Sequence, residues 1–147
     1  MTENKKENLN NRMIKFLFEG APVRGACVQM AEEWQEMIKF HHYPENVAAL
    51  LGQFTAGALL LSSTIKFEGS LILQVKGSGP IAFIYAEVRN PMSVRAMAEI
   101  REGAEIKPEM DLQELINKDG KGLCALILDP KDRRPGVQPY QGMVSLE

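Results

Sequence analysis

The stretch from Pro44 to Leu61, PENVAALLGQFTAGALLL, restricts the fold of this chain more than any other segment. Proline followed by glutamate suits the start of a helix, because proline has no N–H to satisfy there and the carboxylate faces the positive end of the helix dipole. From Val47 onward only Gln53 and Thr55 are polar. A helix without a polar face lies in a protein core or in a membrane, and this run is shorter than the roughly 20 apolar residues of a membrane span. We therefore predict a buried central helix.

Two glycines inside this helix, Gly52 and Gly57, each lower its stability by roughly 1 kcal/mol relative to alanine. A glycine retained at that cost lets another part of the chain come close to the helix. We therefore expect another layer to be pressed against the central helix.

The remaining sequence alternates between strand and helix patterns. Apolar or alternating runs bounded by turn residues predict strands at 13–18, 23–30, 63–67, 71–75, 81–88, 94–100, 123–128 and 140–146. In the segment 94–100, helix-favouring residues compete with a strict alternation, and the alternation favours a strand. An amphipathic helix follows Met30, with Met30, Trp34, Met37 and Ile38 on its apolar face. A short helix begins at the capping box Asp111–Glu114.

Two glycine-containing turns organise the predicted sheet. Glu68–Ser70 is a tight hairpin signal between the runs 63–67 and 71–75. Gly77–Pro80 (GSGP) resembles part of a phosphate-binding loop, but a strand follows it instead of a helix. We interpret it as a turn that uses the positive φ available to glycine. The resulting three-strand meander needs a second layer, so we predict an α+β fold with mixed or antiparallel twisted sheet layers packed on the buried central helix.

Length and charge exclude several classes of protein. At 147 residues the chain has the length of one domain, and its net charge of −2 gives no general attraction to nucleic acid or to an acidic membrane. The polar start, MTENKKENLNNR, lacks the apolar region of a secretion signal, so we expect a cytoplasmic protein. We expect residues 1–11 to be a disordered leader and residues 12–147 to form the domain.

The residues able to ligate a metal form no recognised pattern. Cys27 and Cys124 stand far apart, outside any CxxC or Cys/His spacing, and fit small apolar core residues better than reactive thiols. His41 and His42 have no further ligand at metal spacing and suit a solvated turn before the central helix. We predict no metal ligand and no cofactor-binding residue in this chain.

An enzyme would need an acid–base pair or a nucleophile in a cleft. The candidates have no spacing that implies convergence: His41, His42, Glu87, Glu99 and Cys124. Two adjacent arginines, Arg133 and Arg134, could contact an anion, although a solvated loop tip explains them better. We therefore predict no catalytic residue.

Four segments, in this order, resemble one family. They are FLFEGAPVRG (Phe16–Gly25), HHYPENV (His41–Val47), STIKFEGSLILQVKGSGP (Ser63–Pro80) and PYQGMVSLE (Pro139–Glu147). Together with the helix pattern between them, the resemblance runs from Arg12 to the last residue. The family is that of the redox-regulated thirty-three-kilodalton heat-shock chaperonin, a bacterial holdase.

This resemblance implies a non-enzymatic chaperone domain that works as a homodimer. Such a domain binds unfolding client proteins and prevents their aggregation under heat or oxidative stress. Family members continue into a helical linker and a C-terminal domain, where four cysteines in a CxC and a CxxC hold zinc until oxidation forms disulfides. The present chain contains neither cysteine pair. We therefore expect it to be a truncated N-terminal domain without the zinc domain, and the resemblance assigns no metal role to Cys27 or Cys124.

We assign no client contact to a single residue. Methionine repacks easily and suits adaptable contacts, which makes five residues candidates: Met30, Met37, Met92, Met97 and Met143. Methionine at strand or helix spacing is more often part of a core. Two other interpretations remain open, a small-molecule-binding enzyme and a purely structural dimerisation module.

Overall fold

The structure is a computed structural model that describes residues 11–89, 93–132 and 134–146. Its elements, in chain order, are β1 (Asn11–Leu17), β2 (Arg24–Met30), α1 (Ala31–Lys39), α2 (Glu45–Thr64), β3 (Gly69–Lys76), β4 (Ile81–Arg89), β5 (Ser93–Ile100), α3 (Leu112–Ile116), β6 (Leu123–Pro130) and β7 (Tyr140–Ser145). Asn11, which the sequence placed in a leader, is the first residue of β1. The rest of the predicted leader lies outside the described residues.

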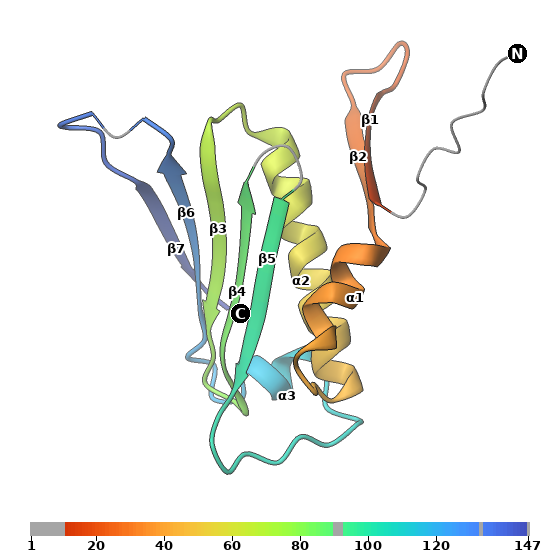
Figure 1. Ribbon diagram of the computed structural model, residues 1–147, viewed down its shortest axis with the longest axis vertical. Helices are drawn as coiled ribbons and strands as arrows, with labels where there is room; N and C mark the ends of the chain where they lie inside the picture. Colours follow the sequence, from red (N-terminus) through yellow and green to blue (C-terminus); the bar gives the residue numbers. More distant parts are fainter. Residues whose placement is uncertain (1–10, 90–92, 133, 147) are drawn as a thin grey trace, which may run out of the picture.

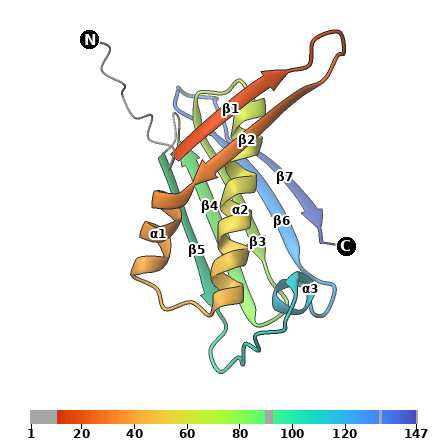
Figure 2. The same ribbon diagram turned by 90° about the vertical axis from the view of Figure 1, so that its right-hand side faces the viewer.

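Five strands form one antiparallel sheet in the order β5-β4-β3-β6-β7, and β1 and β2 form a separate hairpin. Helix α2 runs along one face of the sheet, and α1 lies on the same side (Figures 1 and 2). Among the described residues, no helix covers the opposite face (Figure 1). The predicted α+β fold is confirmed, with a sheet that is antiparallel throughout.

The core lies between α2 and the sheet. Seven residues of α2 are buried: Val47, Ala48, Leu50, Leu51, Thr55, Ala58 and Leu59. They pack against alternate residues of β3 and β4, among them Leu71, Val75, Ile84 and Val88. The buried hydroxyl of Thr55 donates a 2.7 Å hydrogen bond to the carbonyl of Leu51, so it is not left unpaired. The prediction of a central core helix is confirmed, although one face stays open and Leu61 is 39% exposed.

Helix α1 covers part of that open face through one aromatic ring. A Cβ on Gly52 would lie 2.7 Å from Nε1 of Trp34, so only glycine leaves room for the indole. The same Nε1 donates a 3.2 Å hydrogen bond to the carbonyl of Ala48. The expected close approach is confirmed at Gly52. It is wrong for Gly57, where an added Cβ would have no heavy atom within 4 Å.

The prediction of a strand at 63–67 is wrong. Ser63 and Thr64 complete α2, and the hydroxyl of Thr64 donates a 2.8 Å hydrogen bond to the carbonyl of Leu61. This bond satisfies one of the last four carbonyls of the helix, which have no backbone partner within the helix. The β-branched residues of this segment therefore end a helix and lead into an irregular connection.

The predicted hairpin turn at Glu68–Ser70 is also wrong. Gly69, with φ 147°, is the first residue of β3 and lies against the backbone carbonyl of Asp129 on β6. The meander consists of β3, β4 and β5 instead, which confirms a strand over 94–100. Strands β6 and β7 pair as the predicted hairpin partners and extend the sheet beyond β3.

Gly77–Pro80 is a turn between β3 and β4, as predicted, but the expected positive φ is wrong. Neither Gly77 nor Gly79 adopts it. A Cβ on Gly79 would lie 2.7 Å from the carbonyl oxygen of Leu115, and one on Gly77 would collide with the carbonyl of Ile81. The turn packs so closely against α3 that only glycine fits at these positions. Helix α3 starts at the predicted capping box.

Helix α2 passes a length-and-composition test for a membrane span. It has 20 residues, of which seven are buried in the structure. The core helix of a water-soluble domain passes the same test, so this finding is weak evidence. The contacts between α2 and the sheet account for its apolar character.

Candidate protein-binding surface

The β1–β2 hairpin projects beyond the sheet at one end of the molecule (Figure 2). Its strands pair in register from Asn11↔Met30 to Leu17↔Arg24. Beyond the last pair, the N–H of Phe18 donates a 2.9 Å hydrogen bond to the carbonyl of Val23. A two-stranded hairpin is marginal on its own in water, so its position depends on packing against the body.

Only the base of the hairpin reaches the core, where Met13 and Val28 pack beside Met30 and Leu59. Toward the tip, apolar side chains are left in solvent on both faces of the ribbon. We call these residues the hairpin patch: Ile14 (45% exposed), Phe16 (41%), Leu17 (81%), Phe18 (56%) and Val23 (51%). Contiguous exposed apolar residues of this kind mark surfaces that associate with other molecules.

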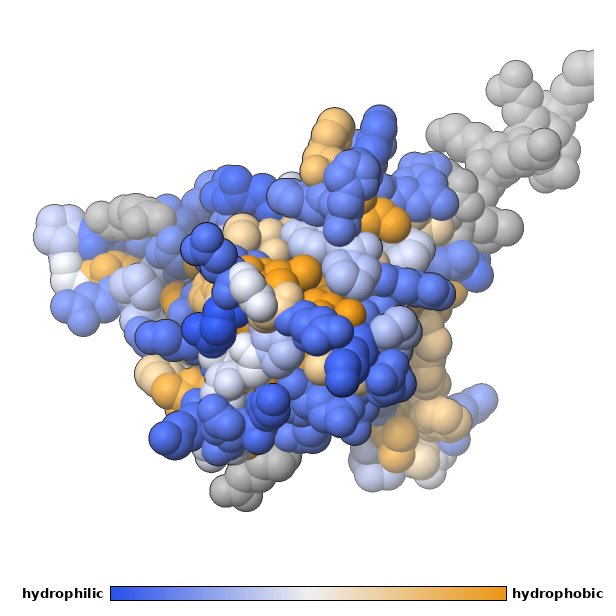
Figure 3. Space-filling model, turned by 90° about the horizontal axis from the view of Figure 1, so that it is seen from below, coloured by the Kyte–Doolittle hydropathy of each residue, from blue (hydrophilic) through white to orange (hydrophobic). Residues whose placement is uncertain are grey.

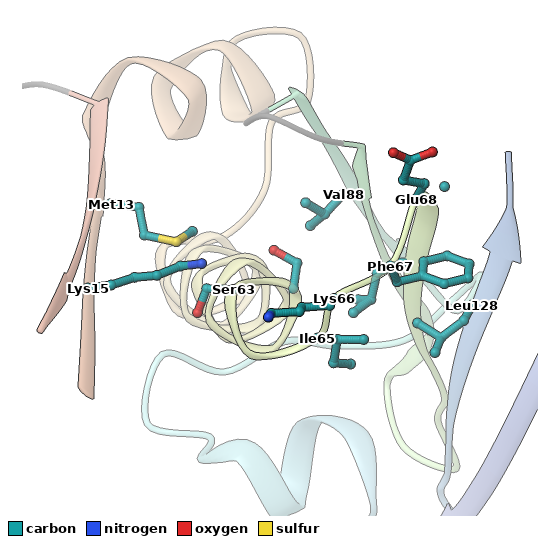
Figure 4. A pocket seen from close by; sticks show the side chains of 12 residues that line it. Met13, Lys15, Ser63, Ile65, Lys66, Phe67, Glu68, Val88 and Leu128 are labelled. Atoms are coloured by element: carbon teal, nitrogen blue, oxygen red, sulfur yellow. The ribbon is translucent and has the colours of Figure 1, made fainter. Parts of the chain in front are cut away.

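A cleft of about 840 Å³ lies between the hairpin and the sheet, beside the last turn of α2 (Figure 4). We call it the hairpin cleft. It is lined by Met13, Lys15, Ser62, Ser63, Leu71, Val88, Leu128 and the connection 65–69. An adjoining hollow of about 770 Å³ continues it along the hairpin toward Leu17 and Arg24. Phe16 and Leu17 of the hairpin patch line this hollow, so the hairpin patch adjoins the hairpin cleft.

A second apolar strip lies on β7, at one edge of the sheet. Tyr140, Met143 and Val144 are 62%, 56% and 63% exposed. β7 pairs only with β6, so its other edge has backbone groups without a strand partner among the described residues. Such an edge is open to pairing with another chain.

The opposite edge of the sheet, at β5, is partly covered. The hydroxyl of Tyr43, in the segment before α2, accepts a 3.2 Å hydrogen bond from the N–H of Ala98.

Figure 3 views the molecule from below. The lower end of the molecule is mainly hydrophilic around a small hydrophobic area. Several large apolar side chains are exposed together on the hairpin and on β7, whereas Phe40 and Leu112, at 75% and 47% exposed, lie away from both.

The candidates for enzymatic chemistry do not converge. His41 and His42 lie exposed in the connection between α1 and α2, where the His41 ring stacks on Tyr43 at 5.2 Å. Glu99 is exposed on β5. In the part of the chain that the structure describes, no hydrogen bond joins any two of the five candidate residues.

Glu87 is the most perturbed of these residues. It is 5% exposed on the sheet face opposite α2, where its carboxylate accepts hydrogen bonds from the Arg95 guanidinium, the Tyr85 hydroxyl and Nε of Arg89 at 2.6, 2.9 and 3.0 Å. Burial alone would raise its pKa, but the three hydrogen bonds outweigh burial and lower the pKa to about 2. Burial and the nearby carboxylate raise the pKa of Tyr85. A carboxylate this firmly ionised is a poor proton donor or acceptor near neutral pH.

The two cysteines differ in their surroundings. Cys27 is exposed on the hairpin, so the prediction that it is a core residue is wrong. Cys124 is half-buried and packs beside the core, and burial raises the pKa of its thiol. Within the described part of the chain, no group of three His, Cys, Asp or Glu side chains could hold a metal ion. The absence of metal and cofactor sites stays a prediction.

The candidate methionines divide between core and surface. Met30 is 9% exposed and Met37 packs beside the core, whereas Met97 and Met143 are 39% and 56% exposed. Arg134 lies in an exposed loop with its Nε 2.7 Å from Oδ2 of Asp132. Met92 and Arg133 lie outside the described residues.

Sequence reasoning missed the hairpin patch. The signal was present in the consecutive apolar residues Phe16, Leu17 and Phe18, because neighbouring strand residues point to opposite faces. A run of this kind makes both faces of a ribbon apolar. Only one of those faces is able to pack on the body of the domain.

The fold and its surface define an α+β domain that exposes apolar side chains on a projecting hairpin. The chain belongs to the Hsp33 family, because the family model described as Hsp33 protein matches residues 11–147. It is 39% identical to the 33 kDa chaperonin of Neisseria gonorrhoeae over 95% of this chain, and 40% identical to that of Nitrosococcus oceani, also over 95%.

The fold is also similar to a crystal structure of the 33 kDa chaperonin of Thermotoga maritima, with a TM-score of 0.72 at 18% identity. That match covers 94% of this chain and 46% of the other. The chain spans 44% of the Neisseria relative and 45% of the Nitrosococcus relative. The comparison therefore concerns less than half of those proteins.

Proposed function

We propose that this chain is a chaperone domain of the holdase type, which binds unfolding proteins and prevents their aggregation under heat or oxidative stress. The observation that carries the proposal is the hairpin patch, which leaves Leu17 81% exposed at the end of a projecting ribbon. A holdase needs apolar surface that associates with non-native chains. The chaperonin names of the relatives support this interpretation.

Redox regulation belongs to the same proposal but acts outside this chain. We propose that zinc and the regulatory disulfides reside in a C-terminal region of the full-length relatives, with Cys27 and Cys124 in no metal role. We further propose that the protein works in the cytoplasm as a homodimer, without nucleic acid or membrane as a partner, and without an enzymatic activity. The low pKa and the three hydrogen bonds of Glu87 support the absence of enzymatic activity, because a carboxylate that stays ionised is a poor general acid or base.

The test is suppression of aggregation, followed by light scattering of thermally unfolding citrate synthase or luciferase. The wild-type chain in several-fold excess is expected to reduce scattering, and Leu17→Ser combined with Phe18→Ser is expected to reduce that protection several-fold. The matched control is Phe40→Ser with Leu112→Ser, since these residues are also exposed, at 75% and 47%, but lie away from the hairpin. A wild-type chain that leaves scattering unchanged at this excess would contradict the proposal.

A structural dimerisation module is the second candidate, favoured by the open edge and exposed side chains of β7. Multi-angle light scattering of the wild-type chain measures its oligomeric state directly. A dimer without protection of clients would support the dimerisation module and reject the holdase. Protection by a chain that stays monomeric would reject the homodimer alone.

A further inference from the structure

The hairpin cleft is continuous with the hollow beside it. The two share Lys15, Ser63, Ile65 and Lys66 as lining residues. The volume of the first, about 840 Å³, lies within the roughly 300–1,000 Å³ of ordinary ligand sites. The combined channel follows the hairpin from Met13 toward Leu17, so it has the elongated form that an extended chain segment would fill.

The floor of the channel is apolar. Ile65 follows the end of α2, and Leu71, Val88 and Leu128 come from three neighbouring strands of the sheet. Leu71 and Val88 are buried, at 4% and 5% exposed, so the floor is a firm part of the core. An apolar segment placed there would lose contact with water along its length.

The walls of the channel are basic on a chain whose net charge is −2. Lys15 and Arg24 come from the hairpin, Lys66 comes from the opposite wall, and Glu68 is the only carboxylate among the lining residues that the structure describes. In Figure 4, Lys15 and Lys66 reach toward one another across the end of α2. Such a local excess of positive charge is complementary to an acidic partner.

The three cations are not used elsewhere in the described structure. Across residues 11–89, 93–132 and 134–146, no salt bridge or side-chain hydrogen bond involves Lys15, Arg24 or Lys66. At the helix end, the hydroxyl of Thr64 bonds the carbonyl of Leu61, one of the last four carbonyls of α2, which have no backbone partner within the helix. The two ammonium groups and the Arg24 guanidinium are therefore able to pair with an incoming ligand.

We propose that the hairpin cleft binds an extended apolar segment of a client protein that has acidic residues beside it. This inference rests on the proposed holdase function and names the class of segment that the domain selects. A second copy of the hairpin fits less well, since its described residues carry Arg12, Lys15 and Arg24 against Glu19 alone and would bring like charge to the cleft.

The test uses fluorescence anisotropy with labelled peptides and the whole chain. Three peptides share one apolar core of Leu, Val and Phe and are flanked at both ends by Asp, by Ser or by Lys. A fourth has Asp flanks on a Ser core. The Asp-flanked apolar peptide is expected to bind about three to ten times more tightly than the Ser-flanked one, which is the scale of a few exposed ion pairs. The preference should fall as salt is raised, because exposed charges are screened.

Charge-reversal variants test whether Lys15 and Lys66 cause the preference for acidic flanks. Lys15→Glu with Lys66→Glu is expected to favour the Lys-flanked peptide, and the milder pair Lys15→Gln with Lys66→Gln is expected to abolish any preference. The control, Lys76→Glu with Lys121→Glu, makes the same charge change at exposed sites outside the cleft and should bind like the wild type. Thermal melts verify that each variant is folded.

Three outcomes would overturn the inference. They are equal binding of the Asp- and Lys-flanked apolar peptides, equal binding of the two Asp-flanked peptides, and an unchanged preference after charge reversal. The second of these would indicate a simple anion patch. Aggregation assays run in parallel keep the two proposals apart: protection without an acidic preference rejects this inference alone, and an acidic preference without protection rejects the holdase alone.

Discussion

Nη2 of Arg95 donates a 2.6 Å hydrogen bond to Oε2 of Glu87, directly across the β4–β5 ladder. The carboxylate is almost fully buried, while the side chains of Arg95 and Arg89 are 70% and 60% exposed. Tyr85 adds a third donor to the same carboxylate. This cluster ties the edge strand β5 to β4 on the sheet face that α2 does not cover.

Replacement of this carboxylate is expected to destabilise the fold. Glu87→Gln keeps the shape of the side chain but removes its charge, and should lower the free energy of unfolding by about 1–3 kcal/mol, the usual cost of disrupting buried hydrogen bonds to charged groups. Urea unfolding followed by circular dichroism measures the change. Glu99→Gln is the matched control on β5, because Glu99 is exposed, and it should change the stability by less than about 0.5 kcal/mol.

The contribution of Glu87 should also depend on pH. Its folded pKa of about 2 lies below its ordinary value of 4.5, so the stabilisation is present above pH 4.5 and is lost as the pH falls toward 2. The difference in unfolding free energy between the wild type and Glu87→Gln is therefore expected to be constant from pH 7 to pH 5 and to shrink at lower pH. A difference that stays constant down to pH 2 would contradict the assigned ionisation.

The two glycines of α2 predict opposite effects of the same substitution. Gly57→Ala should raise the free energy of unfolding by up to about 1 kcal/mol, because alanine favours the helix and its methyl group meets nothing. Gly52→Ala should lower it, because the methyl group would enter the space of the Trp34 indole and disturb its hydrogen bond to Ala48. Thermal unfolding of the two variants under one set of conditions checks the pair. Equal shifts in the same direction would refute the packing of α1 on α2.

The two thiols should react at different rates. Cys27 is exposed, whereas Cys124 is half-buried and burial raises its pKa, so less of it is present as the reactive thiolate. With Ellman's reagent at pH 8, the Cys124→Ser variant is expected to react rapidly through Cys27. The Cys27→Ser variant should react several-fold more slowly. The reverse order would show that the hairpin is covered in solution.

Much of the fold was predictable from local patterns. The apolar run after Val47 identified the central helix, the alternation in 94–100 identified β5, and Asp111 with Glu114 identified the capping box of α3. Each of these signals acts over a few residues, because helix periodicity and capping depend on neighbours in sequence. The prediction of a strand at 63–67 was wrong because Ser63 and Thr64 belong to the last turn of α2. Their hydroxyls donate hydrogen bonds to helix carbonyls, so a β-branched residue such as Thr64 is accommodated at the end of a helix.

The sequence by itself determined the α+β class, the core helix and the resemblance to a chaperonin family, since all three depend on patterns along the chain. Only the tertiary structure decided that β1 and β2 form a hairpin apart from the sheet, that Phe16, Leu17 and Phe18 stay in solvent, and that Lys15 and Lys66 line one cleft. The exposure of a side chain and the grouping of distant charges around one cleft depend on how segments far apart in the sequence pack. A hairpin that packs only at its base must leave its tip, and the cleft beneath it, open to a partner.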